Sequence, residues 1–420
     1  MNSQYASGGE RGGDRTLTIT VSDPKKESEG INSYISYKVN TITNLPEFQY
    51  GQFSVIRRYS DFVWLSEMLQ KDVPGSIVPP LPEKAVVGRF SAEFVESRRR
   101  LLEKFCVRLA AHDELSDSKY FKLFLQADDA GLSVAKAEQK LAEKAEGKKG
   151  GVSGGRGSSF AAMSSWFEES VHSISLTMAA NAEAKEKSPA DEKIDEVVAY
   201  ITNLEVQMGN VAKHTSGLMK RNRDLAHGLF EFGLAFTLLG QTEHAPLNDA
   251  LTKLGSCADQ LSLLATEHVA REDAAFRDPV DDQIRHLASV KAALGQRQKH
   301  KHAVALAEAD LSQRKQAAAK LAGRPGAEGR AVAAEGAIQR AREDVDKARR
   351  ALEVVTARVT RELQRFKALR AAELRRAIAS YVALQAEHSA ALRDQWAELL
   401  PDLDVGAPLP PPPAEEAVGV

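Results

Sequence analysis

Apolar and polar residues follow two different periods along the first third of the chain. Near the N-terminus, apolar residues alternate with polar ones, which is the period of a strand with one buried face. This pattern predicts three strands, at 17–21, 34–39 and 53–59. Apolar residues then recur three and four apart, which predicts helices at about 61–71, 91–111 and 117–125. Strands followed by helices indicate a small α+β domain with an antiparallel sheet.

The region 188–401 is almost wholly helical in pattern. Its first helix carries a long heptad seam with steps of four and three residues. The seam consists of Val197, Ile201, Leu204, Met208, Val211, Thr215, Leu218, Asn222, Leu225, Leu229, Phe232, Phe236 and Leu239. Gly240 and Pro246 end it, and further helices are expected at about 247–322, with a kink at Pro279, and at 330–400. At 1.5 Å per residue such helices are roughly 75–105 Å long.

Three segments lack these periods. Residues 1–15 are polar and rich in Gly and Ser, so a disordered N-terminus is expected. Residues 129–159 change from Ala, Lys and Glu to Gly and Ser, which predicts a flexible linker. Residues 402–420 are proline-rich but have no Lys or Arg beside the prolines. A disordered tail is therefore favoured over a ligand for an SH3 domain.

Residues 160–180 form a separate amphipathic pattern. One face would carry Phe160, Met163, Phe167, Val171, Ile174 and Met178. Trp166 flanks this face, and the opposite side has Ser, Glu and His but no Lys or Arg. Without basic residues, such a helix would not be held by electrostatic attraction to anionic lipid. A serine-rich polar face with bulky apolar residues opposite suits packing defects in a curved membrane instead. Packing of the same stripe against the long helices is the alternative.

Composition limits how the protein can meet a membrane. The chain has 420 residues, 43% of them hydrophobic and 27% charged, and a formal net charge of -2. Attraction to an anionic surface must then come from local patches. No apolar run approaches the ~20 residues of a membrane span, so any membrane contact is expected to be peripheral. Cys106 and Cys257 lie far apart without metal-ligand neighbours, and we expect two buried thiols, with no metal or cofactor.

Candidate chemistry begins at Arg57-Arg58-Tyr59-Ser60-Asp61-Phe62, where the third expected strand meets a helix. A strand that delivers guanidinium groups to a helix start is a plausible anion site. The proline loop Pro79–Lys84 and the run Arg98-Arg99-Arg100 follow. In this order, these segments resemble the phox-homology (PX) domain, a phosphoinositide-binding module, over residues 16–128.

The long helices at 188–401 resemble the BAR domain, a dimeric crescent of three antiparallel helices that fits curved membranes. Further segments, Asn44-Leu45-Pro46-Glu47-Phe48 and Arg89-Phe90-Ser91-Ala92-Glu93-Phe94, agree with the PX-BAR sorting nexins in order and spacing. The resemblance implies an α+β PX domain followed by an all-α BAR domain.

The resemblance also implies roles for residues. Arg58 would bind the 3-phosphate, Ser60 would add a contact at the helix start, and Tyr59 would present its ring to the inositol. Lys84 would meet the phosphate that leads to the lipid tails, and Arg98 would bind the ring hydroxyls. Arg57 and Arg99 are expected to be structural or general membrane charges. Val86, Val87 and Phe90 would either dip into the bilayer or pack under their loop.

Two stretches of the helical half contain bases but no acid. They carry Lys213, Lys220, Arg221 and Arg223 in the first stretch, and Arg285, Lys291, Arg297, Lys299 and Lys301 in the second. Each base near an anionic leaflet contributes about 1 kcal/mol. We therefore expect a basic membrane face, with an ordinary solvated helix face as the alternative.

Together these features predict a peripheral membrane protein that is not an enzyme, since no phosphate loop, metal cluster or triad follows residue 128. It would bind phosphatidylinositol 3-phosphate, related 3-phosphoinositides and anionic curved membranes, but no nucleic acid. The resemblance to sorting nexins implies a place on the cytoplasmic face of early or multivesicular endosomes, or of the trans-Golgi network, in protein sorting and vesicular transport. Homodimers, heterodimers with another PX-BAR sorting nexin, and binding of the retromer core stay open, as do cargo and lipid selectivity. The alternative is a cytosolic coiled-coil scaffold with incidental membrane binding.

Overall fold

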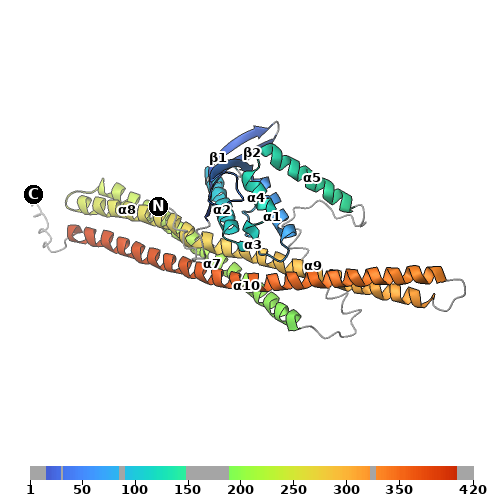
Figure 1. The fold of residues 1–420 in the computed structure, drawn as a ribbon. Helices are drawn as coiled ribbons and strands as arrows, with labels where there is room; N and C mark the ends of the chain where they lie inside the picture. The colour runs from blue at the N-terminus through green and yellow to red at the C-terminus, as the bar shows by residue number, and fades with distance from the viewer. Residues whose placement is uncertain (1–15, 30–31, 85–89, 148–188, 322–327, 404–420) are drawn as a thin grey trace, which may run out of the picture. The chain divides into compact units, whose positions relative to one another are not determined.

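The structure is a computed structural model of the chain, and it describes residues 16–29, 32–84, 90–147, 189–321 and 328–403 (Figure 1). Contacts divide the chain into two compact units. Unit 1 comprises residues 1–201 and 285–367, and unit 2 comprises 202–284 and 368–420. The expected amphipathic helix at 160–180, the loop residues Val86 and Val87, and most of both termini lie outside the described residues.

Unit 1 contains the expected antiparallel sheet, in the order β1-β2-β3. Its strands are β1 (Leu17–Glu29), β2 (Asn32–Thr43) and β3 (Gln52–Arg58). β1 and β2 extend well beyond the expected ranges, because their pairing resumes after an irregularity between Ser22 and Lys25. The residues after it are polar, so backbone pairing continues where no apolar alternation marks it.

Helices cover one face of this sheet. They are α1 (Tyr59–Asp72), α2 (Ala92–Ala110), α3 (Asp113–Ser116) and α4 (Lys119–Gln126). Val21 and Val39 of the sheet are buried with Phe62 of α1, Phe105 of α2 and Phe124 of α4 in one core. The Phe62 ring packs edge-on against both other phenylalanines. The α+β domain predicted from the sequence is thus confirmed.

The expected flexible linker begins as a helix. Residues Asp129–Gly147 form α5, so the expectation of flexibility is wrong for this part, and residues 148–159 lie outside the described range. Ala, Lys, Glu and Gln dominate α5, and these residues favour helix. Trp64 of α1 also donates a 2.7 Å hydrogen bond to Gln139, which ties α5 to the α+β domain.

The remainder is helical, as expected. Its helices are α7 (Pro189–Gly240), α8 (Leu247–Glu272), α9 (Asp278–Ala319) and α10 (Glu328–Leu399). A π-helical turn, η1 (Asp273–Arg277), separates α8 from α9 just before Pro279, where a kink was expected, and a 3-10 turn, η2 (Leu400–Leu403), follows α10. A π turn before a proline accommodates the ring and the lost hydrogen bond. No helix among the described residues is long and apolar enough to cross a membrane.

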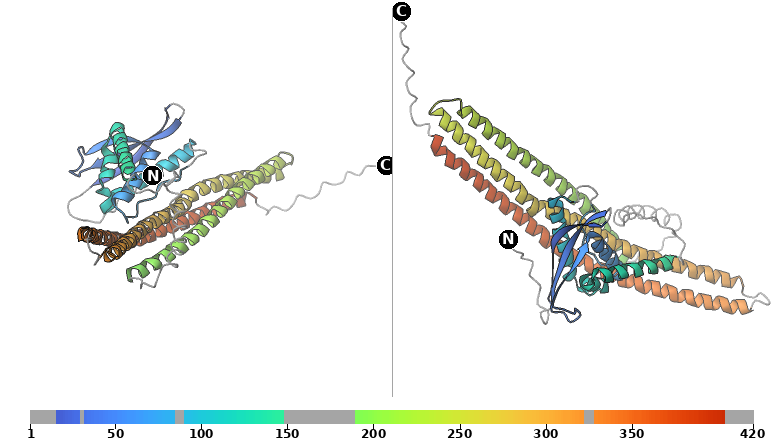
Figure 2. Two further views of the ribbon diagram at one scale, coloured as in Figure 1. Left: turned by 90° about the vertical axis from the view of Figure 1, so that its right-hand side faces the viewer. Right: turned by 90° about the horizontal axis from the view of Figure 1, so that it is seen from above.

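Each unit has its own helix packing. In unit 2, α7, α8 and the end of α10 run side by side (Figure 2). Ser262 of α8 donates a 2.7 Å hydrogen bond to the Ala226 carbonyl of α7, and Cys257 lies 3.8 Å from the Gln395 carbonyl of α10. In unit 1, α9 and α10 lie together, with Arg349 paired to Glu308 at 2.6 Å. Both cysteines are free and buried, as expected.

Within unit 1, α10 also contacts the α+β domain. The buried Glu362 carboxylate accepts hydrogen bonds from the Ile77 amide at 3.1 Å and from His112 Nε2 at 2.9 Å. Arg358 donates to Glu114 and to the Pro74 carbonyl, both at 2.7 Å. Gly75 has φ of +91°, and a Cβ there would lie 3.0 Å from Val355 Cγ1. A side chain at this position would be strained and would push the domain from α10.

Candidate functional site

The site residue Arg58 lies at the junction of β3 and α1. Because side chains alternate along a strand, Arg57 and Arg58 point to opposite faces of the sheet. Arg58 is cross-strand partner to Ser36. Its side chain is 50% exposed, and its guanidinium carbon lies 5.5 Å from the centre of the Tyr34 ring. Such a guanidinium can offer two parallel N–H groups to a phosphate.

Arg57 belongs to the core instead. It is 1% exposed, and its Nε and Nη2 atoms donate to the Phe124 carbonyl at 3.0 and 2.7 Å. Burial lowers the pKa of Arg57, but the neighbouring carboxylates of Asp61 and Asp129 oppose this shift. The structural role expected for Arg57 is confirmed.

Tyr59 connects the other site residues. Its hydroxyl donates a 2.5 Å hydrogen bond to the Pro82 carbonyl, and the guanidinium carbon of Arg98 lies 4.3 Å from its ring centre. Arg98 in turn donates to the Glu83 carbonyl at 2.7 Å. Both bonds hold the proline loop directly before Lys84, so the loop cannot move without breaking them. Burial raises the pKa of Tyr59, with Arg98 opposing, so the phenol remains a donor.

The site therefore joins four elements. Arg58 and Tyr59 come from the β3–α1 junction, Lys84 from the proline loop and Arg98 from α2. Ser60 and Lys84 are exposed, whereas Arg98 is only 8% exposed, between the Tyr59 and Phe94 rings. A charge held between two aromatic faces has a fixed position. This arrangement suits a ligand that combines phosphate groups with a polar ring.

Arg99, next to Arg98, has a structural role, which is one of the two roles expected for it. Its Nη1 donates to the Val21 carbonyl and its guanidinium pairs with Glu96 at 2.8 Å and Glu103 at 3.1 Å. The hydrogen bonds that Arg99 donates to Glu96 are the main reason why the pKa of Arg99 is raised. Arg99 thus joins α2 to the sheet and is occupied by protein groups.

The basic membrane face expected on the helices is incomplete. Arg297 is only 5% exposed, pairs with Asp191 at 2.5 Å and donates to Thr356 at 3.1 Å, so its assignment to a membrane face is wrong. It lies on the inner side of α9, where α7 and α10 supply acceptors. Lys301 also reaches Asp191, at 3.0 Å.

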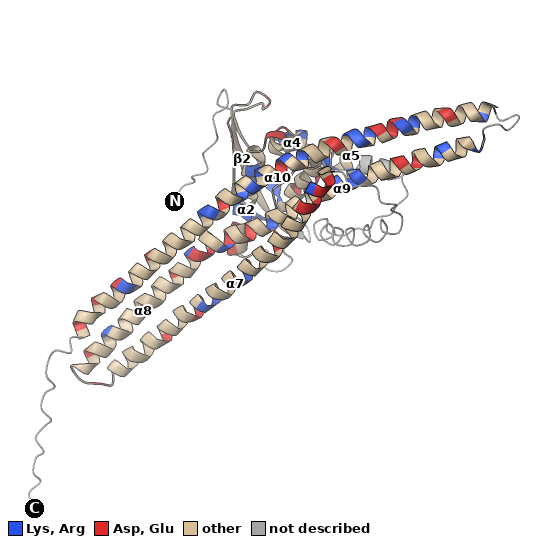
Figure 3. Cartoon of the chain, turned by 90° about the horizontal axis from the view of Figure 1, so that it is seen from below, with Lys and Arg blue, Asp and Glu red and all other residues tan. Residues whose placement is uncertain are grey.

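The other bases of this set differ in exposure. Lys213, Lys220, Arg221 and Arg223 of α7 and Lys299 of α9 are exposed, and Arg285 and Lys291 are half-buried. Figure 3 shows bases and acids interspersed along α9 and α10. The four bases of α7 therefore remain the most coherent candidates for contact with an anionic surface.

Unit 2 exposes an apolar stripe along α7. The stripe consists of Val211, Leu218, Leu225, Phe232 and Leu239, which are 41–59% exposed and recur every seven residues. The other half of the heptad seam, at Met208, Thr215, Asn222, Leu229 and Phe236, is buried or half-buried. One set packs within the chain, and the other forms an apolar surface about 42 Å long.

Known proteins share this organisation. A family model described as Vps5 C terminal like matches residues 167–402, and a PX domain model matches residues 45–128. Sorting nexin 1 of Arabidopsis thaliana is 32% identical over 397 residues, which cover 92% of each chain. The chain belongs to the PX-BAR sorting nexins.

Other relatives agree with this assignment. Human Sorting nexin-1 is 30% identical to this sorting nexin over 319 residues, or 73% of this chain and 56% of that protein. Among solved structures, the SNX-BAR Mvp1 tetramer has a TM-score of 0.63 at 18% identity, covering 91% of this chain and 99% of that one. The likeness to Mvp1 is one of fold.

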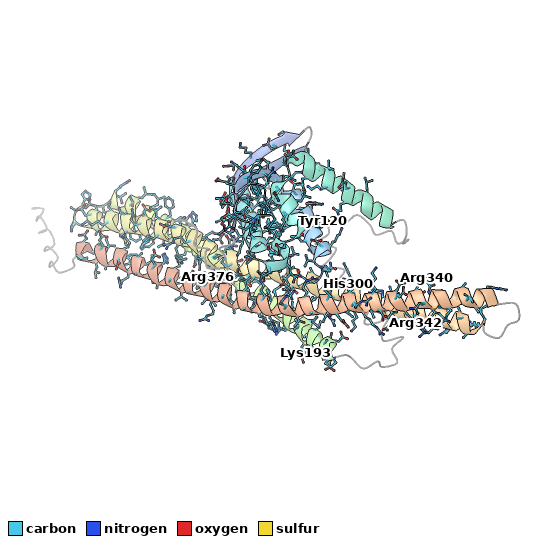
Figure 4. All side chains as sticks on the ribbon, in the orientation of Figure 1. Tyr120, Lys193, His300, Arg340, Arg342 and Arg376 are labelled. Atoms are coloured by element: carbon cyan, nitrogen blue, oxygen red, sulfur yellow. The ribbon has the colours of Figure 1, made fainter. Side chains whose placement is uncertain are left out.

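Sequence reasoning missed several residues of this sorting nexin. Tyr34 packs on Arg58, and strand alternation places Tyr34, Ser36 and Arg58 on one face, so the pattern held the signal. Exposed bases also lie on α10, at Arg375 and Arg376, the second of which is labelled in Figure 4. These two bases lie close to Glu373 and so do not belong to a stretch without acids. Phe90 is exposed, with Lys26 Nζ 4.8 Å from its ring centre.

Proposed function

We propose that this sorting nexin is a peripheral membrane protein that binds phosphatidylinositol 3-phosphate through its PX domain and curved anionic membranes through a dimeric BAR domain. Arg58 binds the 3-phosphate, with Ser60 adding a contact at the helix start. Tyr59 presents its ring to the inositol, Arg98 binds the ring hydroxyls, and Lys84 contacts the phosphate that leads to the lipid tails. The half-exposed Arg58 beside the fully buried Arg57 carries this proposal, because only one guanidinium of the pair is available to a ligand.

The domains proposed are PX at 16–128 and BAR at 188–401. Two weak contacts, one to a lipid headgroup and one to a charged surface, multiply into firm binding when a dimer joins them. The protein would then act on the cytoplasmic face of endosomes, sorting cargo without catalysis. Binding of the retromer core belongs to the same proposal on the ground of family membership.

The apolar stripe of α7 supports the dimer. Five large apolar side chains in one row are an unusual surface for a monomer and a suitable one for a second helix. The partner is a second copy of this chain or another PX-BAR sorting nexin. A cytosolic coiled-coil scaffold would use the same stripe, so membrane binding has to be tested separately.

Vesicle sedimentation tests the lipid site. The full chain should bind phosphatidylcholine vesicles that contain phosphatidylinositol 3-phosphate and leave plain phosphatidylcholine vesicles in solution. Arg58→Ala should abolish this preference, whereas Lys119→Ala, which removes an exposed charge of α4, should retain it. Equal binding to both kinds of vesicle by the unmutated protein would refute the lipid site and favour the scaffold.

A further inference from the structure

Helix α5 returns to the lipid site after the PX fold is complete. At its start, Asp129 lies 3.4 Å from Arg57. Two turns later, Lys136 Nζ lies 5.6 Å from the centre of the Trp64 indole, and in the following turn Gln139 accepts the hydrogen bond from Trp64 Nε1. The Trp64 ring also packs edge-on against Tyr120, which is labelled in Figure 4. These contacts fix α5 beside α1.

Asp61 of α1 is contacted by α5 and lies beside Arg58 of the proposed lipid site. Its Oδ2 accepts the Arg58 amide at 2.8 Å and so caps the start of α1. Its Oδ1 lies 3.7 Å from Arg58 Nε and is bonded by Lys136 Nζ. The carboxylate is largely buried, and so is the Lys136 side chain. A buried carboxylate is thus shared between Arg58, which is proposed to bind the phosphate, and a lysine from α5.

This sharing matters because Asp61 and a lipid phosphate are rivals for one guanidinium. An unopposed carboxylate beside Arg58 would hold the guanidinium and would repel an incoming phosphate. The cap does not explain Lys136, since Oδ2 alone accepts the Arg58 amide. The ammonium instead neutralises the oxygen that faces the guanidinium.

We infer that Lys136 is a positioning residue of the phosphoinositide site, an inference that rests on the proposed function. By holding Asp61 Oδ1, Lys136 leaves the Arg58 side chain half-exposed with its N–H groups available to a phosphate. The lipid site then extends beyond residue 128, where the match to the PX domain ends, and includes the second turn of α5.

The test compares the full chain with four variants, three single and one double, on vesicles of phosphatidylcholine with and without phosphatidylinositol 3-phosphate. Lys136→Met keeps the apolar stem on Trp64 and removes the charge, and it should raise the Kd for the 3-phosphoinositide vesicles about five- to tenfold. Lys140→Met removes an exposed charge one turn later and should change the Kd less than about twofold. Asp61→Asn keeps the capping oxygen, and adding Lys136→Met to it should cause no further loss.

Two results would overturn the inference. One is equal binding by Lys136→Met and Lys140→Met. The other is an equal rise in Kd when Lys136→Met is introduced into the unmutated protein and into Asp61→Asn. That result would show that the lysine acts by packing. A failure of the proposed function looks different: the unmutated protein would not distinguish the two kinds of vesicle, and Arg58→Ala would change nothing. The inference would fall with it.

Discussion

Arg57 and Arg58 are neighbours in sequence, yet their side chains have opposite surroundings. Arg57 makes its hydrogen bonds to protein carbonyls in the core, whereas Arg58 is half-exposed. Arg57→Ala should therefore destabilise the protein by about 2–3 kcal/mol, since it leaves buried carbonyls without donors. Urea denaturation of the full chain, followed by circular dichroism, measures this.

Arg58→Ala is the matched control for that measurement. It should leave the denaturation midpoint nearly unchanged and abolish the preference for phosphatidylinositol 3-phosphate. The reverse outcome, with Arg58→Ala unstable and Arg57→Ala stable but unable to bind, would mean that the two side chains have each other's assigned roles.

Strand alternation was enough to separate these two arginines from the sequence, because the period of β3 is regular up to its last residue. The same approach was wrong for Arg297. A stretch without acids shows how much charge a segment carries but not which side of the helix faces protein. The partner that buries Arg297 is Asp191, which lies 106 positions away in the chain.

Among the elements, α5 and the π turn η1 show what local sequence can indicate. A change in composition marked a boundary after residue 128, and Pro279 marked a break in a long helix. Neither signal specified the outcome. Whether an Ala, Lys and Glu segment is a helix or a linker depends on contacts such as that of Trp64 with Gln139, which no local pattern contains.

The buried carboxylate of Glu362 contributes to the contact between α10 and the PX domain. Burial is the largest influence and would raise the pKa of Glu362, but hydrogen bonds from His112 and the Ile77 amide outweigh it and hold the pKa below its usual range. A carboxyl with a lowered pKa in the folded state contributes stability above its unfolded pKa of about 4.3. That contribution is lost as the pH falls through the folded value.

We therefore expect the thermal stability of the full chain to decline below about pH 4.3, with part of the decline due to Glu362. Glu362→Gln keeps an acceptor oxygen but cannot titrate, so its stability should be lower at pH 7 and should vary less with acid. Glu353→Gln, an exposed change on the same helix, serves as the control. Identical pH profiles for the two variants would contradict the role given to Glu362.

At the scale of the molecule, the α7 stripe predicts self-association. Replacing Leu218, Leu225 and Phe232 by Ser should convert a dimer into a monomer, because it removes most of the apolar surface in the row. Light scattering at micromolar concentration should give twice the chain mass of 45.7 kDa for the unmutated protein and the chain mass for the variant. Leu306→Ser, an exposed apolar residue of α9, should remain dimeric. A monomeric unmutated protein would count against the dimer.

The four exposed bases of α7 predict salt-dependent binding to anionic vesicles. Charge reversal at Lys220, Arg221 and Arg223 should weaken this binding at low salt without changing the mass in light scattering. The difference should vanish near 1 M salt, where the Debye length is about 3 Å. Binding of the unmutated protein that does not respond to salt would exclude an electrostatic role for α7.

The order of domains and the three long helices could be predicted because their patterns repeat over many residues. Which face of a helix packs within the chain, and which face stays exposed, could not be predicted. The eleven apolar seam positions look alike in sequence, yet they divide into a packed set and an exposed stripe. A heptad pattern shows that a helix has apolar partners, and only the packing of α8 and α10 shows which partners lie in the same chain.

The carboxylate of Glu362 accepts hydrogen bonds from two separate parts of the PX domain, the Ile77 amide and the His112 ring. If one donor moved away alone, the carboxylate would stay buried with half of its hydrogen bonds, which is a costly state. Partial detachment is therefore disfavoured, and the domain is either seated on α10 or released as a whole. Small forces on α10 should therefore turn the domain together with the helix, and separation requires both Glu362 bonds to break together with those of Arg358 to Glu114 and to the Pro74 carbonyl.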